Sequence, residues 1–349
     1  MRGLLSYSGI AAKIKAMEGK LITNEQYKAM AALGSVAEAV GFLRTLRPYQ
    51  EIFSNMDDES LHRGSIERLL NDSLYGDYTK LYRFSNLKQR QFLDFYFFHL
   101  ETNILKNCLR NAVAHEPVSL GLARYEEFFG KHSRVDLIRV SASENLDEFI
   151  ENMAGTSYYP ILNHLRESGD TDHFDYEMAL DLFYFKKAWA MIKKTLPKSE
   201  QQSIYKFFGT KLDLLNLQWI YRTKRYYAAS QETIQALLIP LRCNLRKDQL
   251  DKLIKTETIE DFYAELSTTW YGAKLKKADL ADKPDLEILY RFVLNNLHRT
   301  GSKKDPYSMS ILYSYLYFKE AELRKIVTII ESIRYEIDVS EINTYIEQH

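Results

Sequence analysis

The side chains best suited to chemistry lie in the stretch FFGTKLDLLNLQWIYRTKRYY, residues 207 to 227. Asp213 and Asn216 stand three residues apart inside an apolar run, and Arg222 follows in a basic cluster. A carboxylate acts as a general base or a metal ligand only with a nucleophile, a second titratable group or further ligands beside it. The sequence around Asp213 offers none of these, so a structural role competes with a catalytic one.

Helical geometry favours the structural interpretation. At 100 degrees per residue, an apolar stripe forms on one face of this segment, from Phe208, Leu212, Leu215 and Trp219. Asp213 and Asn216 lie beside the stripe, where a helix meets its neighbour. We therefore expect a buried or half-buried polar pair that satisfies the backbone or a side chain of a packed element.

Two further groups of residues have functional and structural interpretations. DTDH at 170–173 could be a metal cluster, but Asp170, Asp172 and His173 stand just before a helix, where aspartates are common caps. Basic side chains near the predicted unit ends are typical of solvated surface, and they are also the candidates for docking an acidic helix or loop of a partner. The candidate contact residues are Lys224, Arg225, Arg299, Lys303 and Lys304.

Composition excludes several classes of protein. The 47 basic and 47 acidic residues cancel, so no global field recruits nucleic acid. The two cysteines have no CxxC or Cys/His neighbour, which argues against zinc. No GxxxxGK[ST], GxGxxG, HExxH or GxSxG motif occurs, so no cofactor site or common hydrolase site is predicted. The N-terminus lacks the apolar run of a signal peptide, and no apolar run in the sequence is long enough to cross a bilayer. Only 7 prolines and 14 glycines occur among 349 residues, and this low content favours an all-α fold.

An internal repeat organises the chain. The segments ENLDEFIENMAGTSYYPIL at 144–162 and ETIEDFYAELSTTWYGAKL at 257–275 align without gaps, and GSVAEAVGFLRTLRPYQEIF at 34–53 is a weaker copy. The copies are spaced by about 112 residues. We predict three repeated helical-bundle units, 1–117 with an N-terminal helix, 118–230 and 231–349, each beginning with a short helix capped by Asn, Ser or Thr.

The long helices repeat at the same spacing. Glu101 and Arg110 precede Asp213 and Arg222 by about 112 residues. In the third copy Arg334 stands at the same spacing of about 112 residues, but Lys325 stands in place of the acid. A shifted register that uses Glu320 or Glu322 with Arg324 is chemically better. We predict helical hairpins: one pairs a helix stopped at Pro197 with a helix capped by Ser199, and the other is joined by a basic loop, RTGSKKD at 299–305.

These patterns resemble a known family. Tyr7, KIKAM at 13–17, KLIT at 20–23, and the recurring L-x-[DE]-F-x-x-x-L-x-x-T-x-Y and D-x-x-N-L-x-x-x-x-R motifs are similar to the C subunits of bacterial and archaeal V/A-type ATPases, the counterparts of the d subunit of the eukaryotic V-ATPase. The chain departs from the pattern at Lys13 and Lys15, where arginines are frequent, and at Ile104, which occupies the Asn position in the first unit.

The resemblance implies a pseudo-threefold funnel of three helical domains. Such a funnel sits peripherally on the cytoplasmic face of the membrane proteolipid ring and receives the central stalk, built of the D and F subunits. The implied function is that of a non-catalytic rotor adaptor for ATP-linked proton or sodium transport, without cofactor, small-molecule substrate or nucleic acid. Two alternatives remain open: a helical-repeat scaffold that binds a soluble protein partner, and an enzyme with an unfamiliar all-α site.

Overall fold

The computed structural model describes residues 2–56, 61–115, 126–169, 172–227, 230–280 and 285–348. Every regular element in these ranges is a helix, which confirms the predicted all-α class. None of the described helices combines the length and apolar character that a membrane span needs.

The helices form two compact units. The terminal unit comprises Met1–Ile14, Ile22–Gly34 and Pro197–His349, and the middle unit comprises Lys15–Leu21 and Ser35–Leu196. The middle unit holds α3 (Val36–Thr45), α4 (Arg47–Gln50), α5 (Arg63–Phe84), α6 (Leu87–Ala114), α7 (Glu126–His132), α8 (Leu137–Ser141), α9 (Leu146–Asn152), α10 (Tyr159–Ser168) and α11 (His173–Thr195). The division into three helical units stays a prediction.

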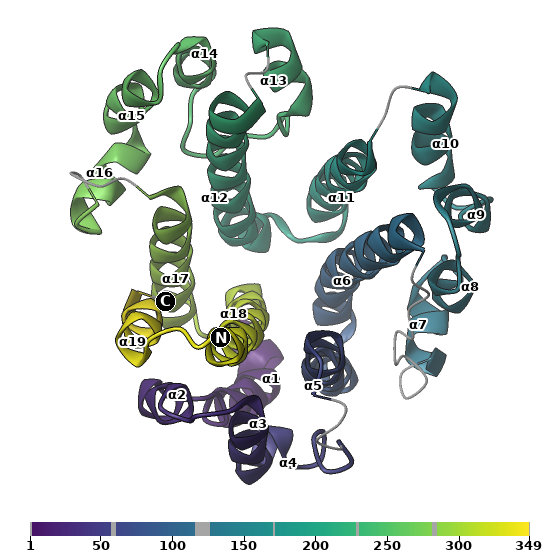
Figure 1. Ribbon diagram of the computed structural model, residues 1–349, viewed down its shortest axis with the longest axis vertical. Coiled ribbons are helices and arrows are strands. Elements are labelled where there is room, and N and C mark those ends of the chain that lie inside the picture. The colour runs from purple at the N-terminus through teal and green to yellow at the C-terminus, as the bar shows by residue number, and fades with distance from the viewer. Residues whose placement is uncertain are drawn as a thin grey trace. The chain divides into compact units, whose positions relative to one another are not determined.

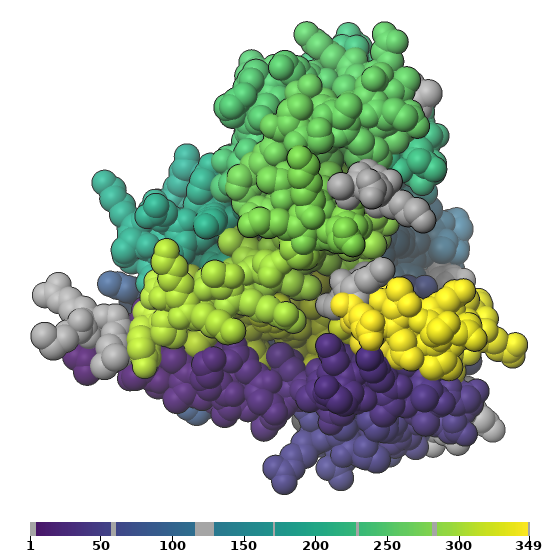
Figure 2. Space-filling model, turned by 90° about the vertical axis from the view of Figure 1, so that its left-hand side faces the viewer, coloured from purple at the N-terminus to yellow at the C-terminus, as the bar shows by residue number. Residues whose placement is uncertain are grey.

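The terminal unit contains both ends of the chain. It holds most of α1 (Arg2–Glu18), α2 (Asn24–Ala31), α12 (Lys198–Arg222), a π-helical turn (Thr223–Tyr227), α13 (Gln231–Leu237), α14 (Lys247–Lys255), α15 (Ile259–Ser267), α16 (Trp270–Lys277), α17 (Leu286–Lys304), α18 (Met309–Arg334) and α19 (Val339–Gln348). The yellow α19 packs against the purple α2 (Figure 2), and Lys28 on α2 forms an ion pair of 2.7 Å with Glu347 on α19.

A carboxylate on α12 joins three helices of the terminal unit. Glu200, in the first turn of α12, accepts a hydrogen bond of 3.0 Å from the Tyr7 hydroxyl on α1. Its other oxygen accepts a bond of 3.0 Å from the backbone N–H of Met309, the first residue of α18. Tyr7, part of the N-terminal motif, therefore ties α1 to the long helices.

The short helices that open the three repeats begin at the predicted caps. Ser35, Asn145 and Thr258 each have extended backbone and accept a hydrogen bond from the N–H three residues later, at the start of α3, α9 and α15. This is standard N-cap geometry, which satisfies one of the free N–H groups of a helix start. The prediction of a capped short helix in each repeat is confirmed.

The long helices pair within their own units. In the middle unit α6 packs along α11, and in the terminal unit α12 packs along α17 (Figure 1). The predicted hairpin of α17 and α18 is present. The other predicted hairpin, of α11 with α12, is wrong: α11 belongs to the middle unit and packs along α6, whereas α12 belongs to the terminal unit and packs along α17. The predicted end of α11 near Pro197 is also confirmed, because α11 ends at Thr195.

Two local predictions are wrong. Ser199 is not an N-cap: Pro197 occupies that position, and α12 has already begun at Lys198. The basic segment 299–305 is not a loop, because α17 continues through Lys304 and ends at the cap residue Asp305. Gly301 lies inside this helix, and its missing side chain serves packing, since a Cβ there would stand 2.3 Å from Cζ of Phe207 on α12.

A buried histidine packs α17 against its neighbours. His298 is 2% exposed and is stacked between Phe207 and Tyr317, with ring centroids 4.6 and 4.1 Å away. Its Nδ1 lies 3.1 Å from the Ser314 hydroxyl oxygen. Burial, reinforced by Lys211, lowers the pKa of His298 to about 3.

This pKa predicts a pH dependence of stability. Between pH 6.5 and about 3 the unfolded chain binds a proton at His298 that the folded chain does not, so the free energy of unfolding falls with acidification. Between pH 7 and pH 5 we expect the wild type to lose about 2 kcal/mol more than His298→Phe. Urea unfolding of both proteins measures the difference, and equal pH dependence would show that His298 is not buried as a neutral ring.

Candidate functional site

The centre of the candidate site is the carboxylate of Asp213 on α12, which is 0% exposed. One oxygen accepts the N–H of Cys243 at 3.1 Å, and the other accepts the N–H groups of Asn244 at 2.6 Å and Leu245 at 3.1 Å. The second oxygen also accepts the hydroxyl of Tyr271, on α16, at 3.0 Å. The carboxylate therefore binds the backbone that leads into α14 and one side chain of α16.

The electrostatic environment of the Asp213 carboxylate suits a hydrogen-bond acceptor. Burial raises the pKa of Asp213 above its usual value, while the backbone N–H groups and the Tyr271 hydroxyl act in the opposite direction. Burial, and then the neighbouring Asp213, raise the pKa of Tyr271 well above its usual value, so the phenol keeps its proton and donates it. The hydrogen-bond donors to Asp213 are thus groups of the protein itself.

The amide of Asn216 extends the same attachment. Its Nδ2 donates to the carbonyl of Ile239 at 3.0 Å, and its Oδ1 accepts the N–H of the same residue at 2.9 Å. An amide is suited to this exchange because it carries both a donor and an acceptor. Asp213 and Asn216 together fix the segment 239–245 on α12.

The middle unit repeats the arrangement with Glu101 on α6, which is 5% exposed. The Glu101 carboxylate accepts the Ser133 hydroxyl at 2.5 Å and the Tyr158 hydroxyl at 2.7 Å. Glu101 and Tyr158 are separated by 57 residues, and Asp213 and Tyr271 by 58. Burial raises the pKa of Glu101 as it does that of Asp213.

A third buried carboxylate, Glu322 on α18, binds the N-terminal part of the chain. It is 4% exposed, accepts the N–H of Ile22 at 2.6 Å, and forms an ion pair of 2.8 Å with Lys319. Lys325 lies one turn further along, with its ammonium 4.7 Å from the centroid of the Tyr27 ring, and burial lowers its pKa to about 8. The helices α6, α12 and α18 thus each bury an acid that binds a segment distant in sequence.

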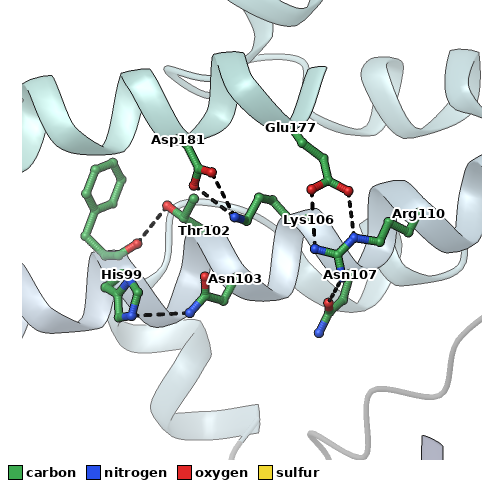
Figure 3. A network of polar contacts seen from close by, with 9 residues as sticks. His99, Thr102, Asn103, Lys106, Asn107, Arg110, Glu177 and Asp181 are labelled. Atoms are coloured by element: carbon green, nitrogen blue, oxygen red, sulfur yellow. Dashed lines mark hydrogen bonds and ion pairs between the residues drawn. The ribbon is translucent and has the colours of Figure 1, made fainter. Parts of the chain in front are cut away.

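The repeated arginines make contacts of a different kind. Arg110 on α6 pairs with Glu177 on α11 at 2.6 Å, next to the pair of Lys106 and Asp181 at 2.9 Å (Figure 3). Arg222 on α12 pairs with Glu287 on α17 at 2.9 Å. The two arginine pairs span 67 and 65 residues, so each joins a long helix to the helix packed along it.

Removing one of these arginines should have a small effect. The side chains of Arg110 and Arg222 are 53% and 54% exposed, and ion pairs at such positions contribute about 1 kcal/mol or less. We therefore expect Arg110→Ala to lower the free energy of unfolding by about 0.5 kcal/mol in denaturant titration. A loss above about 2 kcal/mol would show that the pair of Arg110 and Glu177 is a principal fastening of α6 to α11.

The five candidate contact cations differ in how they are used. Lys224 is half-buried, and its ammonium donates to the carbonyls of Ile254 at 2.6 Å and Thr256 at 2.5 Å, at the end of α14. Arg225, in the π-helical turn, is exposed, as are three residues of the last turns of α17: Arg299, Lys303 and Lys304. Lys224 is thus engaged inside the terminal unit, while the other four face solvent.

The partners of the repeated residues were not predicted from the sequence. Tyr158 and Tyr271 belong to the aligned repeats, but nothing in one copy pairs them with the acids; the recurring separation of 57 and 58 residues was the available signal. Glu177 and Glu287, the partners of the repeated arginines, were missed in the same way.

In the DTDH segment Asp172 is the N-cap of α11, and Asp170 lies outside the described residues. Within the ranges described, no group of acidic, His and Cys side chains could hold a metal ion.

Comparison with known proteins identifies the family. The sequence matches the ATP synthase (C/AC39) subunit family from residue 10 to residue 345. The chain belongs to this family. It is 25% identical over 332 residues to the C subunit of the A-type ATP synthase of Thermococcus kodakarensis, covering 94% of this chain and 86% of the relative. It is 24% identical over 335 residues to the C subunit of the A-type ATP synthase of Methanosarcina acetivorans, covering 93% and 88%. The protein is therefore an ATP synthase subunit and part of a complex of several different subunits.

Proposed function

We propose that this chain is a non-catalytic rotor adaptor of a V/A-type ATPase. In this role it lies on the cytoplasmic face of the membrane and couples the central stalk, formed by the D and F subunits, to the proteolipid ring during ATP-linked proton or sodium transport. The observation that carries the proposal is the use of the buried acids of the long helices: Glu101, Asp213 and Glu322 all bind elements of the protein itself. Family membership and the names of the relatives support the same role.

A torque-transmitting part needs stiffness more than an active site. A buried carboxylate that accepts backbone N–H groups fixes both the register and the position of the segment it holds, since any shift leaves polar groups without partners. Asp213 and Glu322 form two such attachments to backbone N–H groups. Glu101 instead holds the hydroxyls of Ser133 and Tyr158, and the Asn216 amide exchanges two bonds with the backbone of Ile239. This arrangement supports a rigid coupling part.

Direct binding tests the adaptor role. The purified protein is mixed with the D and F subunits, and separately with the detergent-solubilised proteolipid ring. We expect a stable complex with each, recovered by size-exclusion chromatography. Failure to bind either component would contradict the proposal.

An enzymatic role is tested by conservative substitutions at two buried acids. Asp213→Asn and Glu101→Gln remove the charge but keep an acceptor oxygen at both positions. We expect both variants to bind the stalk and ring with no change in any turnover of the isolated chain. Loss of an intrinsic turnover with intact folding would favour an enzyme instead.

A further inference from the structure

A tyrosine-lined pocket lies at the end of α12, within the terminal unit. Its volume is about 250 Å³, and Tyr221, Tyr226, Tyr263 and Arg222 are among the residues that line it. Tyr226 is 67% exposed. Tyrosine and arginine are enriched at the energetic centres of protein interfaces, because they offer large contact area with polar ends. The pocket therefore has the composition of a docking surface.

The π-helical turn Thr223–Tyr227 aims these side chains outward. On its inner side the Thr223 hydroxyl donates to the carbonyl of Trp219 at 2.7 Å, and Lys224 donates to the end of α14. These bonds anchor the turn and leave Arg225 and Tyr226 facing solvent. Single π-helical turns occur frequently at functional sites.

The carboxylates at the pocket already have partners. Asp285 caps α17 by accepting the N–H groups of Glu287 at 2.7 Å and Ile288 at 2.9 Å. Glu287 pairs with Arg222 at 2.9 Å and with Arg291 at 3.4 Å. The carboxylates of Asp285 and Glu287 are therefore already bonded to groups of the terminal unit.

Arg225 is placed differently from the other arginines. Its guanidinium donates to the Tyr221 hydroxyl at 2.9 Å, and its central carbon lies 5.7 Å and 5.8 Å from the ring centroids of Tyr221 and Tyr226. Within the described residues, the hydrogen bond and ring contacts given for the Arg225 guanidinium are to tyrosines. A guanidinium held by aromatic rings keeps its charge and is oriented to receive a carboxylate.

We propose that Arg225 and the tyrosine pocket bind a segment of a partner protein in which an Asp or Glu stands next to an aromatic or aliphatic side chain. The carboxylate binds Arg225, and the apolar side chain lies among the rings of Tyr221, Tyr226 and Tyr263. At about 250 Å³ the pocket is smaller than sites for drug-sized ligands and suits one or two side chains. The inference rests on the proposed function in that the partner is another protein of the same complex.

The test uses the purified ATPase complex lacking this chain as the probe. The variant Arg225→Ala/Tyr226→Ala should bind this complex with a Kd raised about tenfold or more. Arg225→Glu, which keeps the tyrosines, should bind at least as weakly. The matched control is Trp270→Ala/Lys274→Ala, which removes another aromatic and cation pair, 4.3 Å apart on α16 of the same unit, and should bind like the wild type. Thermal unfolding checks that all variants are folded.

A photocrosslink identifies the occupant. With p-benzoylphenylalanine in place of Tyr226, the assembled complex should yield a crosslink to a segment of another subunit that contains Asp or Glu beside an apolar residue. Wild-type affinity in the Arg225 variants, or a crosslink to lipid or nucleic acid or to none of the subunits, would overturn the inference while leaving the adaptor role intact. If the wild-type chain itself does not bind the complex, the proposed function fails instead.

Discussion

Asp213→Leu should lower the free energy of unfolding by about 4 kcal/mol, the largest loss expected from any single substitution at the buried acids. Leucine fills similar space but leaves the N–H groups of Cys243, Asn244 and Leu245 and the hydroxyl of Tyr271 without their acceptor. Each unsatisfied buried donor costs about 1–3 kcal/mol, and partial access of water to the loop reduces the sum. Urea unfolding followed by circular dichroism measures the loss.

The graded control is Asp213→Asn, which retains one acceptor oxygen and replaces the other by a donor. We expect it to destabilise the protein less than leucine does, by about 2 kcal/mol, because part of the N–H set keeps its acceptor. If Asp213→Leu costs less than about 1 kcal/mol, the carboxylate does not fasten the 243–245 segment, and the structural account of the repeated acids is wrong.

Gly272→Ala should destabilise the protein by about 3 kcal/mol, because there is no room for a side chain at this position of α16. A Cβ there would stand 2.2 Å from the backbone oxygen of Ser267 and 2.4 Å from its carbonyl carbon. Backbone atoms cannot rotate away as a flexible side chain can, so α15 and α16 must separate at their junction. The shift in the midpoint of urea unfolding measures the cost.

The matched control for this substitution is Gly41→Ala in α3. A Cβ at Gly41 meets nothing within 4 Å, so alanine should raise stability by about 0.5–1 kcal/mol through its better helix propensity. Opposite signs at the two glycines are therefore expected. A neutral or stabilising Gly272→Ala would mean that the junction of α15 and α16 is looser than described.

The sequence alone predicts the helical class and the repeated caps, because both depend on local chemistry. Ser35, Asn145 and Thr258 stand where a cap is needed, and each is followed three residues later by an acid. The position of Asp213 beside an apolar stripe likewise predicts its burial, since the helical period determines which flank faces a neighbour.

The partners of these residues depend on tertiary packing, which one copy of a repeat does not reveal. Nothing near Glu322 indicates that it binds the N–H of Ile22, almost the whole chain away. The helical state of 299–304 was missed for a related reason. Glycine is frequent in loops, so Gly301 favours a loop when the sequence is taken alone. In the structure Phe207 packs against Gly301, and this contact leaves no room for a side chain at that position of α17.

The most direct test of the central claim is coupling in reconstituted vesicles. ATPase complexes assembled with and without this chain are compared for ATP hydrolysis and for ATP-driven ion uptake. We predict that omission abolishes ion uptake while ATP hydrolysis by the soluble head continues, and that adding the purified chain restores uptake. Ion uptake at the full rate without the chain would contradict the proposed coupling of stalk to ring by this chain.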